Sequence, residues 1–262
     1  LMDDALALEL GATVYGAATD VFVNADGYKK SISGPGVGNY ITMAKSVAAA
    51  RAILGEQAIR EGGFVQAHGT GTPQNRVTES VIVSRTAEAF GIDNWPVVAL
   101  KSYLGHSLGA ASGDQVTATL SMWHHGLIPG INTIDALADD VQTDHLAFSK
   151  EHRRFDPDQS QYAVINSKGF GGNNATATLL SPAATLRLLK QRCTSKQWKS
   201  WQTANEAVVQ AQADYDEGMI AGTVEPVYRF DHGVLADGDV QLDAHKVNVG
   251  GYEVSLDLEN PF

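Results

Sequence analysis

The sequence predicts an α/β layered fold, and three observations support this class. From residue 1 to about residue 182, short apolar runs alternate with longer alanine-rich stretches of helical period. The chain of 262 residues is 44% hydrophobic, which is enough to form a continuous core. After about residue 182 the composition changes. We therefore predict a domain of residues 1–182 with an appended extension of residues 183–262.

Helices are predicted where apolar side chains recur every three or four residues, because this spacing places them on one helix face. The two clearest stripes are Met43, Val47, Ala50 and Leu54, and then Val83, Ala87 and Phe90. Gly91 follows the second stripe directly and is a typical helix stop. Both stripes are predicted to face the core.

Three short apolar runs are predicted to be buried strands: residues 64–68, 97–100 and 162–166. Each run ends in a polar, glycine-rich turn. Active sites of α/β sheets form where several strands end. We therefore expect these three turns to form one site, although they lie far apart in the sequence.

The extension has two parts of opposite charge. Residues 183–200 carry five basic residues and no acidic one, and a helical pattern continues to about residue 215. Residues 217–262 carry nine acidic residues against two basic ones, with alternating Val, Leu and Tyr residues between glycine turns. The sequence thus predicts a basic, exposed helical arm and then a small β element of two to four strands.

The composition excludes several classes of protein. Nineteen Lys and Arg against thirty Asp and Glu give a net charge of −11, which disfavours general affinity for nucleic acid or anionic membranes. Cys193 is the single cysteine, so an intrachain disulfide and a cysteine-rich metal site are excluded, and a reducing cytoplasm fits best. No run approaches the roughly 18 apolar residues of a membrane span. We predict no metal site and no nucleotide site.

The first two turns each present a histidine. His68 lies in the turn of residues 67–73, where glycines leave the imidazole uncovered and threonines offer hydroxyl groups to a polar ligand. His106 lies in the turn of residues 101–111, five residues after Lys101. The third turn, residues 166–174, carries the bulky Phe170 between glycines, a pattern typical of a loop that gates a cavity.

In this order and at these separations, the three motifs resemble the carboxyl-terminal half of the β-ketoacyl-acyl carrier protein synthases. These are condensing enzymes of fatty acid synthesis with a thiolase-like fold. The similarity runs from residue 1 to about residue 181, with residues 24–38 as the loop before the long helix and residues 128–132 leading into later strands. The resemblance implies half of a thiolase-like layered fold, with a mixed sheet covered by helices.

The resemblance also implies roles for individual residues. It assigns His68 and His106 as the catalytic histidines, Lys101 as the lysine that orients the second histidine, Glu79 as the acid near the first, Thr70 and Thr72 as contacts of the phosphopantetheine arm, and Phe170 as the gate between the acyl pocket and the malonyl site. No resident cofactor is implied, because the phosphopantetheine arm of acyl carrier protein or coenzyme A arrives with the substrate. Three positions depart from the common pattern: Arg76, Gln115 and Lys168.

The family reaction requires a cysteine that accepts an acyl group before the enolate of a malonyl thioester attacks it. In the family this cysteine lies at a helix amino terminus, upstream of all three motifs, where the helix dipole lowers its pKa. Cys193 follows all three motifs and is predicted to lie in the basic helix, so we do not assign it a catalytic role. The chain opens on Leu1 without a methionine, and we expect a segment absent from this chain to supply the cysteine.

Three functions follow as alternatives. The first is one half of a decarboxylative condensing enzyme that acts with acyl carrier protein, as a cytoplasmic homodimer. The second is a cysteine-less partner subunit that is catalytically silent or only decarboxylates. The third is a module that tethers the carrier protein through its basic arm. The candidate bases for carrier docking are Arg51, Arg60, Arg76, Arg187, Lys190 and Arg192.

Overall fold

The structure is a computed structural model that describes residues 1–27, 35–225 and 230–259. It contains two compact units, Leu1–Val209 and Gln210–Phe262.

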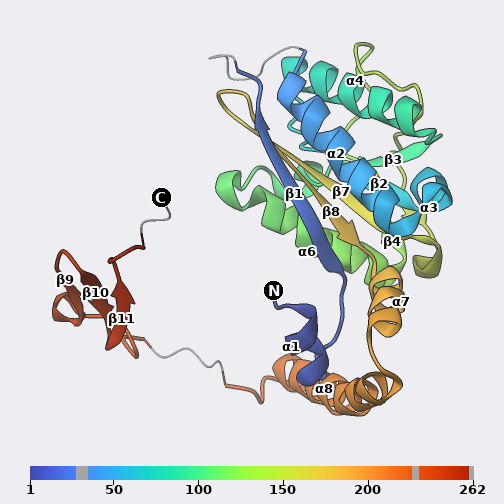
Figure 1. Cartoon of the computed structure of the whole chain (residues 1–262). Helices are drawn as coiled ribbons and strands as arrows, with labels where there is room; N and C mark the ends of the chain where they lie inside the picture. Colours follow the sequence, from blue (N-terminus) through green and yellow to red (C-terminus); the bar gives the residue numbers. More distant parts are fainter. Residues whose placement is uncertain (28–34, 226–229, 260–262) are drawn as a thin grey trace. The chain divides into compact units, whose positions relative to one another are not determined.

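A six-stranded mixed sheet forms the centre of the first unit, in the order β1-β8-β7-β2-β3-β5 (Figure 1). The strands are β1 (Ala17–Ala25), β8 (Asn173–Leu180), β7 (Tyr162–Gly169), β2 (Gly63–Gln66), β3 (Trp95–Val98) and β5 (Leu146–Ala147). β7, β2, β3 and β5 run parallel to one another, while β8 runs antiparallel to both β1 and β7. The three predicted strands are the three that meet at the centre of this sheet, and the predicted mixed α/β class is confirmed.

Helices cover both faces of the sheet. Side chains alternate along β7, so Tyr162 and Val164 belong to one core cluster and Ala163 and Ile165 to the other. Side chains of α2 (Val37–Leu54) and α4 (Pro73–Phe90) complete the first cluster, and side chains of α6 (Ala111–His125) complete the second. The sheet is therefore the middle layer of three.

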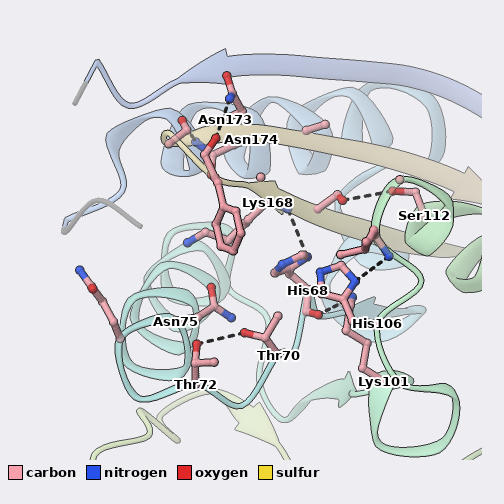
Figure 2. Close-up of a pocket in the computed structure, with 18 of the residues that line it drawn as sticks. His68, Thr70, Thr72, Asn75, Lys101, His106, Ser112, Lys168, Asn173 and Asn174 are labelled. Carbon is pink, nitrogen blue, oxygen red and sulfur yellow. Dashed lines mark hydrogen bonds between the residues drawn. The ribbon is translucent and has the colours of Figure 1, made fainter. Parts of the chain in front are cut away.

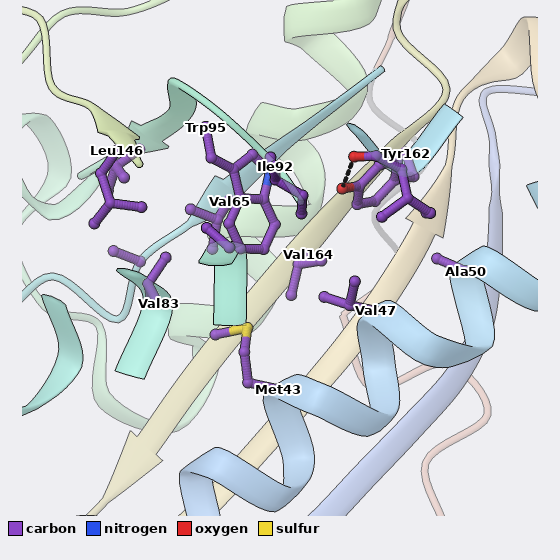
Figure 3. Close-up of a cluster of buried hydrophobic side chains, with 14 of the residues drawn as sticks. Met43, Val47, Ala50, Val65, Val83, Ile92, Trp95, Leu146, Tyr162 and Val164 are labelled. Carbon is purple, nitrogen blue, oxygen red and sulfur yellow. Dashed lines mark hydrogen bonds between the residues drawn. The ribbon is translucent and has the colours of Figure 1, made fainter. Parts of the chain in front are cut away.

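The two predicted helical stripes form this core. Met43, Val47 and Ala50 on α2 are fully buried against the sheet, as Figure 3 shows. Both helices begin before the first residue of their apolar stripe. α4 begins at Pro73, and proline suits the first position of a helix because the N–H that it lacks would have no partner there. α4 ends at Gly91, which adopts the left-handed φ of 65° expected of a helix stop.

Shorter elements complete the first unit. They are α1 (Asp4–Glu9), α3 (Glu56–Glu61), α5 (Lys101–Leu104), two 3-10 turns (Leu108–Ala110 and Pro157–Gln159), and the antiparallel pair β4 (Leu127–Ile128) and β6 (Arg153–Arg154). The loop predicted at residues 24–38 falls partly on residues 28–34, which lie outside the described residues. Its described ends belong to β1 and α2.

The arm after residue 182 is two helices, α7 (Pro182–Arg192) and α8 (Ser195–Ala221), rather than the single helix predicted. Thr194 accepts a hydrogen bond from the Gln197 backbone N–H at 3.2 Å, and the Gln197 side chain accepts one from the Thr194 N–H at 3.0 Å. This reciprocal capping box starts a new helix. Cys193 consequently has an extended backbone at the carboxyl cap of α7, so its predicted position inside a helix is wrong.

Packing continues from the sheet domain into the start of α8. The Trp201 indole N–H donates to the Ala12 carbonyl at 3.1 Å, and the Asn205 amide donates to the Gly11 carbonyl at 3.0 Å. The division predicted at residue 182 follows a change in composition, whereas the two compact units divide between Val209 and Gln210.

The second unit holds the antiparallel strands β9 (Val240–Leu242), β10 (Lys246–Val249) and β11 (Tyr252–Ser255), preceded by a 3-10 turn at Asp237–Asp239. Three strands in the described part of the tail agree with the predicted two to four. Among all described residues, no helix is long and apolar enough to span a membrane.

Candidate active site

The three predicted turns meet at one pocket of about 1110 Å³ (Figure 2). The first turn contributes His68, Thr70 and Thr72 to its lining, the second contributes Lys101 and His106, and the third contributes Lys168 and Phe170. The parallel strands β2, β3 and β7 explain this convergence. The first two turns follow the carboxyl ends of β2 and β3. The third turn is shorter than predicted, because residues 166–169 belong to β7 and residues 173–174 to β8, which leaves residues 170–172 as the turn.

His68 is held from several sides just beyond β2. Its side chain and backbone are 6% exposed. Its backbone N–H donates to Glu79 at 2.7 Å, and its Nδ1 accepts the Lys168 backbone N–H at 3.3 Å. Burial lowers the pKa of His68 from 6.5 to about 4, with Glu79 opposing the shift and nearby Lys101 adding to it. The imidazole is therefore neutral at pH 7.

Glu79 on α4 is the anchor of this turn. Its carboxylate is buried and accepts four hydrogen bonds, from the backbone N–H groups of His68 and Gly69 and from the side-chain amides of Asn75 and Asn166, at 2.6 to 3.0 Å. A buried charge is stable only with such partners. Glu79 thus ties α4, β7 and the first turn together.

Lys101 begins α5 and links the second turn to the first. Its Nζ donates to the His68 backbone carbonyl at 2.6 Å, whereas the resemblance associates this lysine with His106. Burial lowers the pKa of Lys101, and the carboxylates of Glu79 and Asp114 oppose that shift.

His106 lies on an exposed turn whose own backbone orients the ring. Its Nδ1 accepts the backbone N–H of Leu108 at 3.1 Å. Leu108 has a φ of 56°, a left-handed conformation that costs a residue other than glycine about 1 kcal/mol or more. The centres of the His68 and His106 rings are 5.3 Å apart, and their planes meet at 82°.

The hydrogen bonds assign the same tautomer to both rings. Because Nδ1 of each histidine accepts a backbone N–H, the proton of each neutral ring lies on Nε2. Two N–H donors beside one pocket can stabilise negative charge that develops on a single oxygen atom. This is the main chemical capability of the site.

The remaining predicted residues lie around the pocket. The hydroxyl groups of Thr70 and Thr72 are hydrogen-bonded to each other at 3.2 Å. Phe170 is 83% exposed in the turn between β7 and β8, where Gly171 and Gly172 have φ values of 85° and 78°. Cys193 is not among the described residues that line this pocket.

Two of the three departures from the family pattern have structural partners. Arg76 forms a two-pronged ion pair with Asp140, at 2.7 and 2.9 Å, which raises the pKa of Arg76 and lowers that of Asp140. Gln115 is buried, and its amide donates to the Ala67 carbonyl at 2.8 Å, directly before His68. The third departure, Lys168, lies on β7, and its backbone N–H donates to the His68 ring.

Sequence reasoning missed the amide partners of Glu79. Asn75 and Asn166 were assigned no role, although Asn166 begins the predicted third turn, a position that the structure places in β7, and Asn75 precedes Glu79 by four residues on one helix face. That helical spacing was the available signal.

The fold of this chain resembles that of the ketosynthases. Residues 15–135 match the family model of the β-ketoacyl synthase carboxyl-terminal domain. The β-ketoacyl-[acyl-carrier-protein] synthase FabY of Pseudomonas aeruginosa is 46% identical over 256 residues, which are 98% of this chain and 40% of that protein. The crystal structure of FabY has a TM-score of 0.84 and 45% identity, covering 100% of this chain and 41% of that chain.

A second relative matches a smaller part of the chain. The 3-oxoacyl-[acyl-carrier-protein] synthase 2 of Vibrio cholerae is 30% identical over 170 residues, which are 63% of this chain and 38% of that protein. The chain therefore spans about two fifths of the length of these relatives, and its extension is shared with FabY. This chain belongs to the β-ketoacyl-acyl carrier protein synthase family.

Proposed function

We propose that this chain forms the histidine-bearing part of a β-ketoacyl-acyl carrier protein synthase. The reaction is the decarboxylative condensation of an acyl thioester with malonyl-acyl carrier protein in fatty acid synthesis. The observation that carries the proposal is the pair of Nε2–H donors of His68 and His106 beside one pocket. Family membership and the printed names of the relatives support the reaction class.

The two histidines act on the malonyl thioester. Its carbonyl oxygen accepts both Nε2–H groups, the bond to the carboxylate carbon breaks, and carbon dioxide leaves. The electron pair of that bond forms an enolate, whose negative charge on oxygen the two donors stabilise. The enolate carbon then attacks the acyl carbonyl on the cysteine, the carbon–sulfur bond breaks, and the thiolate leaves.

A neutral His68 suits this role. With a pKa of about 4, the ring keeps one proton on Nε2 at pH 7 and donates it without carrying a positive charge. Glu79 and Lys101 hold the backbone on either side of the ring, so the donor direction is set before substrate binds.

The nucleophilic cysteine belongs, in this proposal, to a segment outside this chain. Cys193 caps α7 and does not line the described pocket. The relatives are more than twice as long as the matched region, which leaves room for such a segment. The alternative is a partner subunit without a cysteine, which would decarboxylate but not condense.

Acyl carrier protein is the proposed partner, as the names of the relatives suggest for those proteins. We propose that Thr70 and Thr72 contact the phosphopantetheine arm and that Phe170 gates the pocket, because all three line it. Four candidate docking bases already have acidic partners within the chain: Arg51 and Arg60 with Glu56, Arg76 with Asp140, and Arg192 with Asp4. Lys190 is an exposed candidate. We further propose a homodimer.

The test uses the complete enzyme with carboxyl-labelled malonyl-acyl carrier protein and an acyl thioester. Release of labelled carbon dioxide together with a 3-ketoacyl product supports the proposal. Decarboxylation without a condensation product supports the partner-subunit alternative. The absence of both decarboxylation and condensation overturns both hypotheses. Mass spectrometry after treatment with a thiol-reactive inhibitor identifies the nucleophile, and stoichiometric active-site labelling of Cys193 would contradict the proposed external cysteine.

A further inference from the structure

Lys168 has an unusual environment for a charged side chain. It lies near the end of β7, lines the pocket, and its backbone N–H contacts the His68 ring (Figure 2). Its Nζ is buried and has no hydrogen-bond partner among the described residues. Lys101, the other lysine of the pocket, is instead bound to the His68 carbonyl.

The nearby carboxylates do not provide the missing partner. Glu79 accepts four hydrogen bonds from other groups. Asp26 accepts the Gly38 backbone N–H at 2.6 Å and the Asn174 amide at 3.0 Å through one carboxylate oxygen. Both acids favour the charged form of Lys168, while burial lowers its pKa by a larger amount. The fold alone thus gains little from an ammonium group here.

An unpartnered buried charge normally destabilises a protein, so its presence beside a reaction site points to a ligand of opposite charge. The proposed substrate brings one such group, the malonyl carboxylate. In a malonyl thioester the carboxylate carbon is two bonds from the thioester carbonyl carbon, which must lie at the two histidines. The lysine stem has four carbons and can turn its ammonium group within the pocket.

We propose that Lys168 binds the carboxylate of the malonyl thioester and thereby selects the malonyl substrate over uncharged acyl thioesters at this position. The inference rests on the proposed function. Lys168 supplies a positive charge to the substrate before decarboxylation, while His68 and His106 take the negative charge afterwards. Substrate binding and enolate stabilisation are thus assigned to different side chains of the pocket.

The experiment replaces Lys168 by Met in the complete enzyme. The KM for malonyl-pantetheine should rise about 10- to 100-fold, the scale of a lost hydrogen bond to a charged group. Acyl transfer from acetyl-pantetheine to the cysteine should change less than about twofold, because that substrate has no carboxylate. Lys168→Arg should restore most of the malonyl affinity, and Lys45→Met, at an exposed position on α2, is the matched control.

Melting temperature and direct binding complete the design. The Lys168→Met variant should be at least as stable as the parent, since it removes an unpartnered buried charge. An unchanged KM for malonyl-pantetheine, or equal losses on both substrates, overturns the inference. A loss seen only with phosphopantetheine thioesters assigns Lys168 to the phosphate and also overturns it. Calorimetric binding of malonyl-pantetheine tests Lys168 even if the parent enzyme proves unable to condense, so the two failures are distinguishable.

Discussion

The two histidines of the pocket are held by turns of opposite construction. His68 is buried, and Glu79, Lys101 and Lys168, from three different elements, contact its backbone or ring. His106 is exposed, and its ring is oriented by a backbone N–H two residues further along the same turn. The first donor is fixed by the core, and the second by local backbone geometry.

This difference separates stability from activity. A change to the supports of His68 disturbs buried charges and the hydrogen bond that Asn166 of β7 donates to Glu79 of α4. A change at His106 disturbs an exposed ring and leaves the core intact. The same reaction can therefore be damaged by two routes that stability measurements distinguish.

The largest effect, a loss of stability, is expected from Glu79→Leu, which removes the carboxylate that holds the first turn. Four donors lose their acceptor, and unsatisfied buried donors cost about 1–3 kcal/mol each before relaxation. We expect a loss of about 3–5 kcal/mol in the free energy of unfolding, measured by urea denaturation. Glu88→Leu, at an exposed position on the same helix, should change it by less than about 0.5 kcal/mol. A similar small change for both variants would contradict the anchoring role.

His106→Ala tests the other turn. Loss of one donor to the developing oxyanion should lower malonyl decarboxylation about 100- to 1000-fold. The urea midpoint should stay close to that of the parent, because the ring is exposed. His125→Ala on α6, also exposed, controls for the loss of a surface histidine. Parental decarboxylation by a well-folded His106→Ala protein would remove His106 from the mechanism.

The buried position of His68 predicts a pH dependence of the free energy of unfolding. With a pKa of about 4 in the folded protein and 6.5 when exposed, the unfolded chain binds more protons at this site between those pH values. The contribution of His68 to the free energy of unfolding is therefore fully present above pH 6.5. It is lost as the pH falls through 4, by about 3 kcal/mol at most. The stability difference between the parent and His68→Gln should therefore shrink over this window. A difference that stays constant from pH 7 to pH 4 would show that His68 titrates normally.

The core and the site were predictable to different degrees. The stripes on α2 and α4 and the central strands have strong apolar patterns, so their positions followed from the sequence. β1 and β8 were not predicted, because β8 is an Asn-, Ala- and Thr-rich strand and β1 is an edge strand with a mixed pattern. The break at Cys193 depends on one capping box, a signal of two residues within a long helical pattern.

Within the site, the histidines and Lys101 were recognisable because they follow buried strands on glycine-rich turns. Glu79 was found only through the family resemblance. Asn166 was missed because its amide acts across 87 residues of sequence, between β7 and α4, and no local pattern specifies that contact. Tertiary contacts of this kind require the fold.

The smallest effect is expected outside both turns, at the exposed bases of the arm. Lys190 and Lys196 are exposed and belong to a segment without acids, so together they can attract an acidic carrier protein. Replacing both by Glu should raise the KM for malonyl-acyl carrier protein about two- to fivefold at low salt, because exposed charge pairs contribute little each. The increase should fade near 0.5 M salt, on the order of the ionic strength that screens surface charges. Malonyl-pantetheine has no carrier protein, so its KM should not change, and Lys45→Glu on α2 controls for the altered net charge. An equal rise in KM for both substrates would mean that the arm affects the pocket itself and does not act by docking the carrier protein.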